Sequence, residues 1–257
     1  MSRIYVTGDC HADFSKFKTR NFPEQKELSH KDFVIICGDF GIWDNCAEEK
    51  YRLNWLNKKP FTTLFVDGNH ENFDRLYSNE FEIVRFHGGK AHKIRDNIYH
   101  LMRGHMFNIC GKKIFAFGGA ASHDIKDGIL EPNDYKDTRS LIKDYNNKTL
   151  QGKLCRINHI SWWKEEIPSD EEMAFGLQTL KKHNFKVDYV ITHCCPQEVA
   201  SYISYGFYKP DKLTSYFNKV DEKLDFNTWF FGHYHRDETI YFGNKYVMLY
   251  NKIMRVL

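Results

Sequence analysis

One pattern recurs along this chain: a short apolar run ends at a glycine or a turn, and a polar or charged side chain follows. Its clearest copy is Phe33–Asp39, where Val34–Cys37 is an unbroken apolar run rich in β-branched residues. Such a run is typical of a strand buried on both faces, as in a covered parallel sheet. Gly38 allows a sharp turn, and Asp39 then lies where open α/β sheets usually hold ligands. A single pair of this kind proves little, because many strands end in Gly-Asp for turn chemistry alone.

Four further segments have a similar form. They are Ile4–His11, Thr63–Glu71, Val187–His193 and Asn227–His235. The polar side chains that follow the five apolar runs are Asp9, His11, Asp39, Asn69, His70, His193, His233 and His235. A lone histidine at a strand end is usually a structural residue. Five strand ends that all deliver Asp, Asn or His side chains indicate a common site.

The spacing of the other elements predicts an α/β fold. Asp44–Asn57 reads as a helix between two of the strands, and strands that alternate with helices imply βαβ units and a parallel sheet. Phe81–Gly119 contains short apolar runs between glycine turns, which predicts antiparallel hairpins. Ser169 and Glu172 form a capping-box pattern for a helix that ends near His183. Three short strands are expected at the end of the chain, at Thr239–Phe242, Tyr246–Leu249 and Ile253–Leu257.

The chain has no stretch of linker composition, so we expect one domain that spans residues 1–257. Residues 124–158 are polar and rich in turn residues, with a helical stretch around Asp137–Tyr145. We expect this segment to be a surface insertion or lid. Long polar excursions of this kind often form lids or binding loops.

Composition restricts the class of protein. The net charge of +3 gives no sign of a basic stripe that tracks nucleic acid, although a local patch is not excluded. Seven cysteines without a C-x-x-C pair argue against a disulfide framework and a cysteine-rich zinc site. No apolar signal region precedes the first strand, and no stretch approaches the length of a membrane span. These features favour a reduced, cytoplasmic protein with no membrane partner.

The strand-end side chains have the chemistry of metal ligands. Asp and His together suit divalent ions such as Mn²⁺, Fe²⁺ and Zn²⁺. Seven candidate ligands are too many for one ordinary site and suit two ions that share a carboxylate. Two ions ~3.5–4 Å apart can generate a hydroxide nucleophile and hold a phosphoryl oxygen.

These residues carry a family resemblance. Five blocks resemble, in order, the signature blocks of the calcineurin-like metallophosphoesterases: Gly8-Asp9-Cys10-His11, Gly38-Asp39, Gly68-Asn69-His70-Glu71, His193 and Gly232-His233-Tyr234-His235. The resemblance implies two mixed β-sheets packed as a sandwich and flanked by helices, with a dimetal site at the strand ends. It implies Asp9, His11 and His235 on one metal, Asn69, His193 and His233 on the other, and Asp39 bridging both. His70 would be the uncoordinated catalytic histidine, and we expect Glu71 to anchor the turn.

The chain departs from the family pattern at two places. Ala12 stands where the family usually has glycine, which shifts the turn. Phe40-Gly41-Ile42-Trp43 follows Asp39, whereas phosphoprotein phosphatases and diadenosine-tetraphosphatases continue with Asp-Arg-Gly. The missing phosphate-binding arginine disfavours those two activities. Gly118–Asp124 and Trp162–Glu166 instead resemble blocks of small bacterial-type members of the family.

The leading hypothesis is a phosphoesterase that uses two divalent ions, Mn²⁺ first and Fe or Zn²⁺ as alternatives. It would hydrolyse a monoester or diester of a phosphorylated small molecule or nucleotide by attack of a metal-bridging hydroxide. Asn69, His123 and Trp162 are candidate substrate contacts; a surface-loop role for His123 and a packing role for Trp162 stay open. The alternatives are a catalytically silent scaffold of the same fold and a nuclease of the same superfamily.

Overall fold

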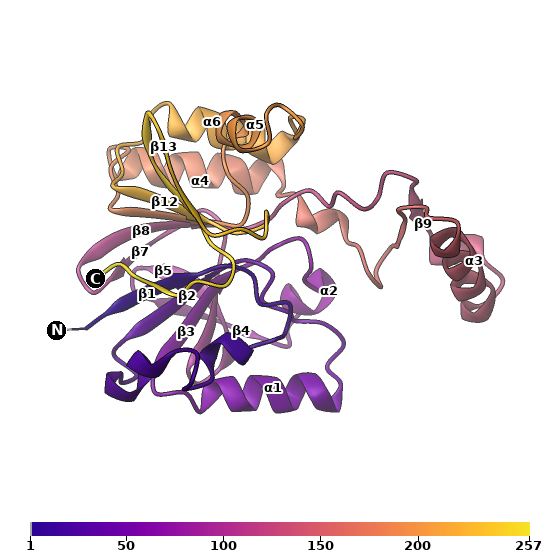
Figure 1. The fold of residues 1–257 in the computed structure, drawn as a ribbon, viewed down its shortest axis with the longest axis horizontal. Coiled ribbons are helices and arrows are strands. Elements are labelled where there is room, and N and C mark those ends of the chain that lie inside the picture. Colours follow the sequence, from indigo (N-terminus) through magenta and orange to yellow (C-terminus); the bar gives the residue numbers. More distant parts are fainter. Residues whose placement is uncertain (1) are drawn as a thin grey trace.

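A computed structural model describes residues 2–257 and places them in two facing β-sheets with helices on the outer faces (Figure 1). The strands of the first sheet are β1 (Ile4–Thr7), β2 (Phe33–Cys37), β3 (Thr62–Val66), β4 (Glu82–Phe86), β5 (Gly89–Arg95), β6 (Ile98–Leu101) and β15 (Met254–Arg255). Their order across the sheet is β15-β1-β2-β3-β6-β5-β4. The central strands β1, β2, β3 and β6 run parallel, and the outer strands are antiparallel to their neighbours.

The second sheet is also mixed. Its strands are β7 (His105–Ile109), β8 (Lys112–Phe117), β11 (Tyr189–Thr192), β12 (Thr228–Phe231), β13 (Glu238–Phe242) and β14 (Asn244–Met248). Their order is β13-β14-β12-β11-β8-β7. The four inner strands are parallel, and each edge strand closes an antiparallel hairpin.

Apolar side chains from both sheets meet in a shared layer, which confirms the predicted sandwich. Ile35 of β2 and Ile191 of β11 belong to this layer and are fully buried. On the opposite face of β2, Val34 and Ile36 pack into a separate cluster under the helices. The whole of β2 is therefore buried on both faces, as its unbroken apolar run predicts.

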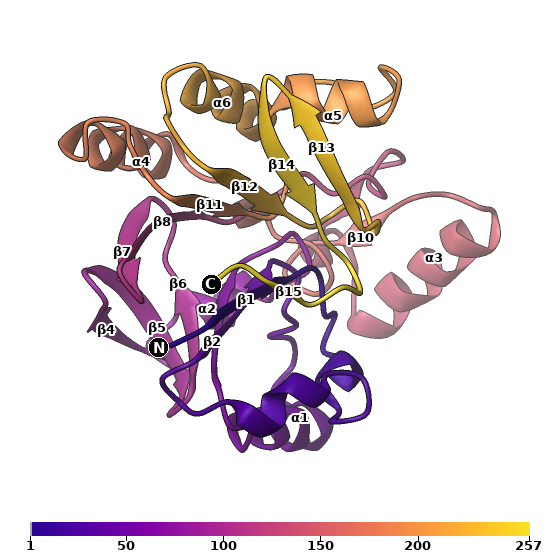
Figure 2. The ribbon, with the colours of Figure 1, turned by 60° about the vertical axis from the view of Figure 1, so that its left-hand side comes forward.

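Helices cover the two outer faces. Beside the first sheet lie α1 (Ala47–Asn57) and α2 (Phe73–Leu76), and α4 (Asp170–Lys182), α5 (Gln197–Ile203) and α6 (Lys212–Asp221) cover the second (Figure 2). The short 3-10 helices are Ser15–Phe17, Pro23–Glu27, Pro132–Asp134 and Lys164–Glu166. Among residues 2–257, the structure has no helix with the length and apolar character needed to span a bilayer.

One segment leaves this body. Residues 124–158 contain β9 (Ile129–Leu130), α3 (Thr138–Leu150) and β10 (Arg156–Ile157), and Figure 1 shows β9 and α3 extending away from the two sheets. We call residues 124–158 the excursion. Helix α3 buries only Leu141, and Leu150 at its end is 86% exposed. The excursion adds little to the apolar core.

The predicted elements agree with the structure except at several boundaries. Helix α1 begins at Ala47, three residues after the predicted start, and the last predicted strand is reduced to the two residues of β15. The capping box of α4 is confirmed, since Ser169 and Glu172 exchange both hydrogen bonds. Strand β5 and helices α2, α5 and α6 were not predicted from the sequence. For α6 a signal was present, because the Asp211 side chain caps it and Leu213, Phe217 and Val220 follow at helical spacing.

Candidate metal centre

The predicted ligands lie on loops that follow five parallel strands, β1, β2, β3, β11 and β12, from both sheets. Asp9, Asp39, Asn69 and His193 are at most 4% exposed, whereas His235 is exposed at the rim. Burying carboxylates is costly unless they are paired or bind a metal. The strand ends therefore gather buried polar groups that need paired partners or a metal ion.

Asp9, His11 and His235 form the first group of side chains. The Oδ2 atom of Asp9 lies 3.1 Å from Nε2 of His235 and 3.9 Å from Nε2 of His11. The two Nε2 atoms are 3.2 Å apart. All three donor atoms fall within the span of one ion-binding site, which brings together the first predicted ligand set.

Asp39 lies between this group and His193. Its Oδ2 atom is 3.7 Å from Nε2 of His11 and 3.3 Å from Nε2 of His193, and its Oδ1 atom accepts the backbone N–H of His70 at 2.9 Å. Nδ1 of His193 donates to the carbonyl oxygen of Cys37 at 2.7 Å, so Nε2 faces the carboxylates. A histidine held in this way has the arrangement of a metal ligand.

The second predicted ligand set comes together only in part. Oδ1 of Asn69 lies 3.2 Å from Nε2 of His193. The ring of His233 lies 4.9 Å from the ring of His193, but Nε2 of His233 contacts Nε2 of His123 at 3.0 Å. Burial, with the charge of His193, holds the pKa of His233 well below its usual value. The structure thus adds His123 as a direct neighbour of this group.

The buried carboxylates attract positive charge. Although burial lowers it, the Asp39 and Asp9 carboxylates raise the pKa of His193 to about 10. Burial raises the pKa of Asp39, yet the neighbouring histidines hold it well below the usual range. Carboxylate oxygens, an amide oxygen and imidazole nitrogens are donors that suit Mn²⁺, Fe²⁺ and Zn²⁺. The residues present therefore fit divalent metal ions.

Several residues of these loops have a strained backbone. His11, Ala12, Asp39, His233 and His235 all have φ between 45° and 67°, in the left-handed region. Such conformations cost about 1–3 kcal/mol each and cluster at functional sites. Ala12, which replaces the usual glycine, keeps a conformation that favours glycine.

Small residues let the loops interlock. A Cβ atom on Gly38 would lie 2.2 Å from Nδ1 of His193, and one on Gly232 would lie 2.1 Å from Oδ1 of Asp9. Each glycine thus makes room for a ligand that comes from another loop. This explains, in part, why a glycine precedes the polar residue in the recurring sequence pattern.

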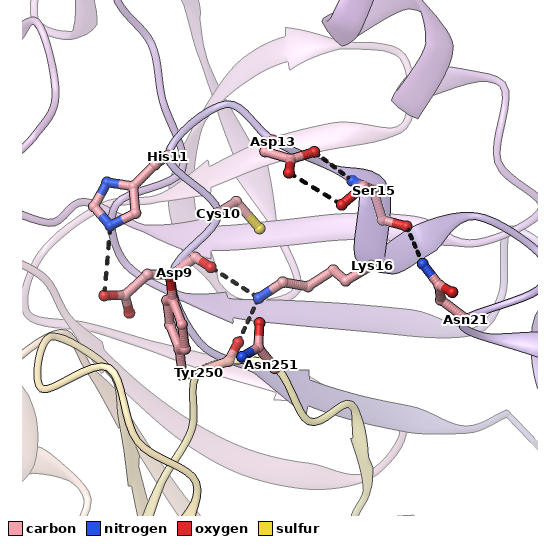
Figure 3. A pocket seen from close by; sticks show the side chains of 9 residues that line it. All are labelled: Asp9, Cys10, His11, Asp13, Ser15, Lys16, Asn21, Tyr250 and Asn251. Carbon is pink, nitrogen blue, oxygen red and sulfur yellow. Dashed lines mark hydrogen bonds and ion pairs between the residues drawn. The ribbon is translucent and has the colours of Figure 1, made fainter.

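Two further side chains fix the loops. The buried carboxylate of Glu71 accepts the backbone N–H groups of Phe40, Gly41 and Ile42, which confirms its predicted role as an anchor, here of the turn after Asp39. Nζ of Lys16 donates to the carbonyl oxygens of Gly8, Asp9 and Tyr250, and Figure 3 shows the last two of these bonds. Lys16 thereby joins the Asp9 loop to the C-terminal part of the chain.

The base of the excursion contacts the centre through hydrogen bonds. Nδ2 of Asn69 donates to Oγ of Ser122 at 3.1 Å. Ser122 in turn donates its hydroxyl to Glu166 at 2.6 Å and its backbone N–H to the same carboxylate at 2.8 Å. Ser122 and Glu166 flank the excursion in sequence, so this bridge closes its base and turns Oδ1 of Asn69 toward His193.

Three cavities border the predicted ligands. One of about 270 Å³ lies over Asp39, Asn69 and His233, with His123 and Tyr208 in its wall. A second, of about 380 Å³, is lined by Asp9, Lys16 and Tyr250, among others (Figure 3). The third, of about 610 Å³, extends from His11 and His70 to the excursion.

The predicted substrate contacts His123 and Trp162 differ in whether they line a cavity. His123 lines the cavity over Asp39, and its ring stacks on Tyr208 at 5.3 Å. Trp162 is half-buried and lines none of the three cavities in the part of the chain that the structure describes, whereas Trp43 and Trp163 line the largest. A substrate contact by Asn69, His123 or Trp162 stays a prediction. A sequence signal for Trp43 was present, because it lies four residues after Asp39, in the segment that departs from the family pattern.

The sequence is similar to that of known phosphoesterases. The profile of the calcineurin-like phosphoesterase family matches residues 2–237. Lariat debranching enzyme from Homo sapiens is 25% identical over 216 residues, which cover 78% of this chain and 34% of that protein. Lariat debranching enzyme A from Xenopus laevis is 30% identical over 154 residues, which cover 53% of this chain and 27% of that protein.

The chain spans about a third of the length of these relatives, or less. Among solved structures, phosphopantetheinyl hydrolase from Mycobacterium tuberculosis aligns with a TM-score of 0.48 at 13% identity, covering 100% of this chain and 96% of that one.

Proposed function

The chain belongs to the calcineurin-like phosphoesterase family, and on this premise we propose that it hydrolyses phosphoric esters at a centre of two divalent metal ions. The observation that carries the proposal is the position of Asp39. One of its carboxylate oxygens faces His11 on one side and His193 on the other, at 3.7 and 3.3 Å. A shared carboxylate between two groups of donors is the arrangement that two neighbouring cations require.

The proposed ligand sets follow the five loops. Asp9, His11 and His235 hold one ion, and Asn69, His193 and His233 hold the other, with Asp39 shared between them. The close approach of Asp9 to His11 and His235 supports the first set, and that of Asn69 to His193 supports the second. His233 needs only a change of side-chain partner, because its ring already lies beside that of His193.

When bound, two such ions supply a strong nucleophile at neutral pH and offset the charge of the phosphoryl group. The chain's own residues supply the rest. Asp39 offsets the repulsion between the two cations. His70 lies between the cavity over Asp39 and the large cavity, and we assign it the transfer of a proton to the departing oxygen.

The substrate class is a phosphorylated small molecule or a nucleotide. Two relatives named for debranching lariats place nucleic acid among the substrates to test, although the net charge of +3 gives no sign of a basic groove. Mn²⁺ is the first metal to test, followed by Fe²⁺ and Zn²⁺. We also propose a cytoplasmic location, since all seven cysteines are unpaired.

The test is reconstitution of metal-free protein with each ion, followed by metal analysis and a substrate screen. The screen contains phosphomonoesters, phosphodiesters, nucleotides, cyclic nucleotides and a branched oligoribonucleotide. We expect two ions per chain and hydrolysis that needs both. Active protein that holds one ion or none would contradict the two-metal proposal. Fully loaded protein that cleaves none of these esters would favour a silent scaffold.

A further inference from the structure

The largest cavity at the centre has an aromatic wall. Its volume is about 610 Å³, and His11 and His70 lie at one end, with Arg156, Ile160 and Trp163 toward the excursion. Small-molecule sites usually have volumes of about 300–1,000 Å³ and mostly apolar walls with a few polar groups. The cavity therefore has the size and lining of a site for the organic part of a substrate.

Trp43 has the geometry of a stacking surface. Its indole Nε1 donates to the carbonyl oxygen of His70 at 3.0 Å, which fixes the ring beside the proposed proton donor. The residue is nevertheless 40% exposed and lines the cavity. A ring whose N–H is already bonded offers its apolar surface to a ligand.

The other walls also favour a ring. Nε1 of Trp163 donates to Asp74 at 2.7 Å, so this indole has no N–H left for a ligand. Arg156 is paired with Asp124 through two guanidinium nitrogens, which offsets the charge of its head group. Ile160, 51% exposed, adds an apolar rim. Asp44, Asn72 and Ser161 complete the lining. Contact with Trp43, Trp163 and Ile160 is therefore by packing and stacking.

The cavity beside Asp9 is more polar. Its lining includes Asp13, Ser15, Asn21 and the backbone-bonded Lys16 (Figure 3). Its aromatic residue, Tyr250, is stacked on His235. The three donors of the Lys16 ammonium are directed to backbone carbonyl oxygens, so this lysine holds two loops together and has no donor left for a ligand. Among the three cavities that border the ligands in the described residues, tryptophans thus line only the one that extends from His70 toward the excursion.

We propose that the Trp43 cavity binds a planar aromatic or heteroaromatic ring, carried by the alcohol that leaves from the phosphoric ester and stacked on Trp43. This inference rests on the proposed function for the position of the leaving group. The ring is assigned to the leaving alcohol because Trp43 is hydrogen-bonded to His70, the proposed proton donor to the departing oxygen. Trp43 is then a specificity-determining residue, and the enzyme prefers esters of ring-bearing alcohols such as nucleosides.

Adenosine 5′-monophosphate and ribose 5-phosphate form a matched pair of substrates, because both break the same kind of primary ester and differ in the base. For Trp43→Ala we expect kcat/KM to fall roughly ten- to hundredfold more for the nucleotide than for the sugar phosphate, the range of one stacked base. Trp43→Phe should restore most of the difference. Tyr241→Ala, an exposed aromatic on edge strand β13, should leave both substrates unchanged. Equal losses on both substrates would overturn the inference while hydrolysis itself stands.

A binding measurement separates this inference from the proposed function. Calorimetric titration of Mn²⁺-loaded protein with adenosine should give a dissociation constant that rises roughly ten- to hundredfold in Trp43→Ala. Ribose should bind far more weakly than adenosine to the unaltered protein. If no ester is hydrolysed, the proposed function fails, but this titration still shows whether the Trp43 cavity binds an aromatic ring. Adenosine binding that is absent, or equal in protein with and without Trp43, would overturn the inference.

Discussion

The ligand loops and the excursion lie next to each other and differ in burial and in backbone strain. The loops bury Asp9, Asp39 and His193 and hold several residues in strained left-handed conformations. The excursion is mostly exposed, and its helix α3 buries a single side chain. Strain persists only where the surroundings fix it, whereas an exposed segment can change without loss of the core. We therefore expect the first region to carry out the reaction, and the excursion to take part, together with Trp43, in the selection of substrates.

Ser122 and Glu166 join the two regions. They flank the excursion, and Ser122 also accepts the hydrogen bond that orients Asn69. Burial raises the pKa of Glu166 to about 7, although the hydrogen bonds from Ser122 lower it. The two regions therefore differ clearly in burial, but they are physically connected at this bridge.

The largest expected effect is that of Asp39→Asn. The change keeps the shape of the side chain and removes the charge that offsets repulsion between two neighbouring cations. We expect loss of both ions and of activity, measured by metal analysis and ester hydrolysis after reconstitution. Asp96→Asn, on an exposed turn of the same sheet, is the matched control and should keep both ions. Retention of two tightly held ions in Asp39→Asn would contradict a shared carboxylate.

The next effect is that of His70→Asn. Positioned proton donation typically contributes ~10²–10⁴-fold, and its value depends on how much the leaving group needs a proton. We expect a loss of this size on alkyl phosphate esters, a much smaller loss on nitrophenyl esters, and intact metal content. His30→Asn is the control on an exposed histidine, and Glu71→Gln should show no leaving-group bias. An equal loss on both ester types would mean that His70 stabilises the phosphoryl group instead.

A smaller effect should arise where the two regions meet. Ser122→Ala removes the acceptor that orients Asn69, and losses of about 10–100-fold in metal affinity are typical when such a supporting partner is changed. Calorimetric titration with Mn²⁺ should detect this loss, and Glu166→Gln should reproduce part of it. The double variant should lose no more than Ser122→Ala, because both residues act through Asn69. Additive losses, or a similar loss in the exposed control Ser78→Ala, would count against the bridge.

The smallest effect on the chemistry should come from shortening the excursion. The backbone N–H of Asp127 donates to the carbonyl oxygen of Leu154 at 2.8 Å, so a short glycine linker can replace residues 128–153. This deletion removes β9 and α3 and keeps Arg156 and Trp163. We expect the ranking of substrates to change while a small generic ester is still hydrolysed with two bound ions. An unchanged ranking in the folded variant would show that selection resides elsewhere.

The sequence by itself identified side chains that meet at the candidate centre, because their signal is local. An apolar run, a turn and a polar residue are contiguous in the chain, and the ends of parallel strands meet at the same edge of a sheet. Asp9, Asp39 and His193 could therefore be assigned to one site, and the sandwich of two sheets followed from the family pattern. The capping box formed by Ser169 and Glu172 could also be predicted, since its residues lie within four positions of each other.

Only the tertiary structure decided which side chains surround that centre. The contact of His123 with His233 spans 110 residues, and the bridge from Ser122 to Glu166 spans 44. No local pattern specifies such pairs, because they depend on how two sheets and an excursion pack against each other. The same reason explains the tryptophans: Trp43 and Trp163 line the largest cavity, whereas Trp162 points to no cavity at the centre among the described residues. Adjacent residues at an irregular turn take different directions, and packing alone selects the one that meets the site.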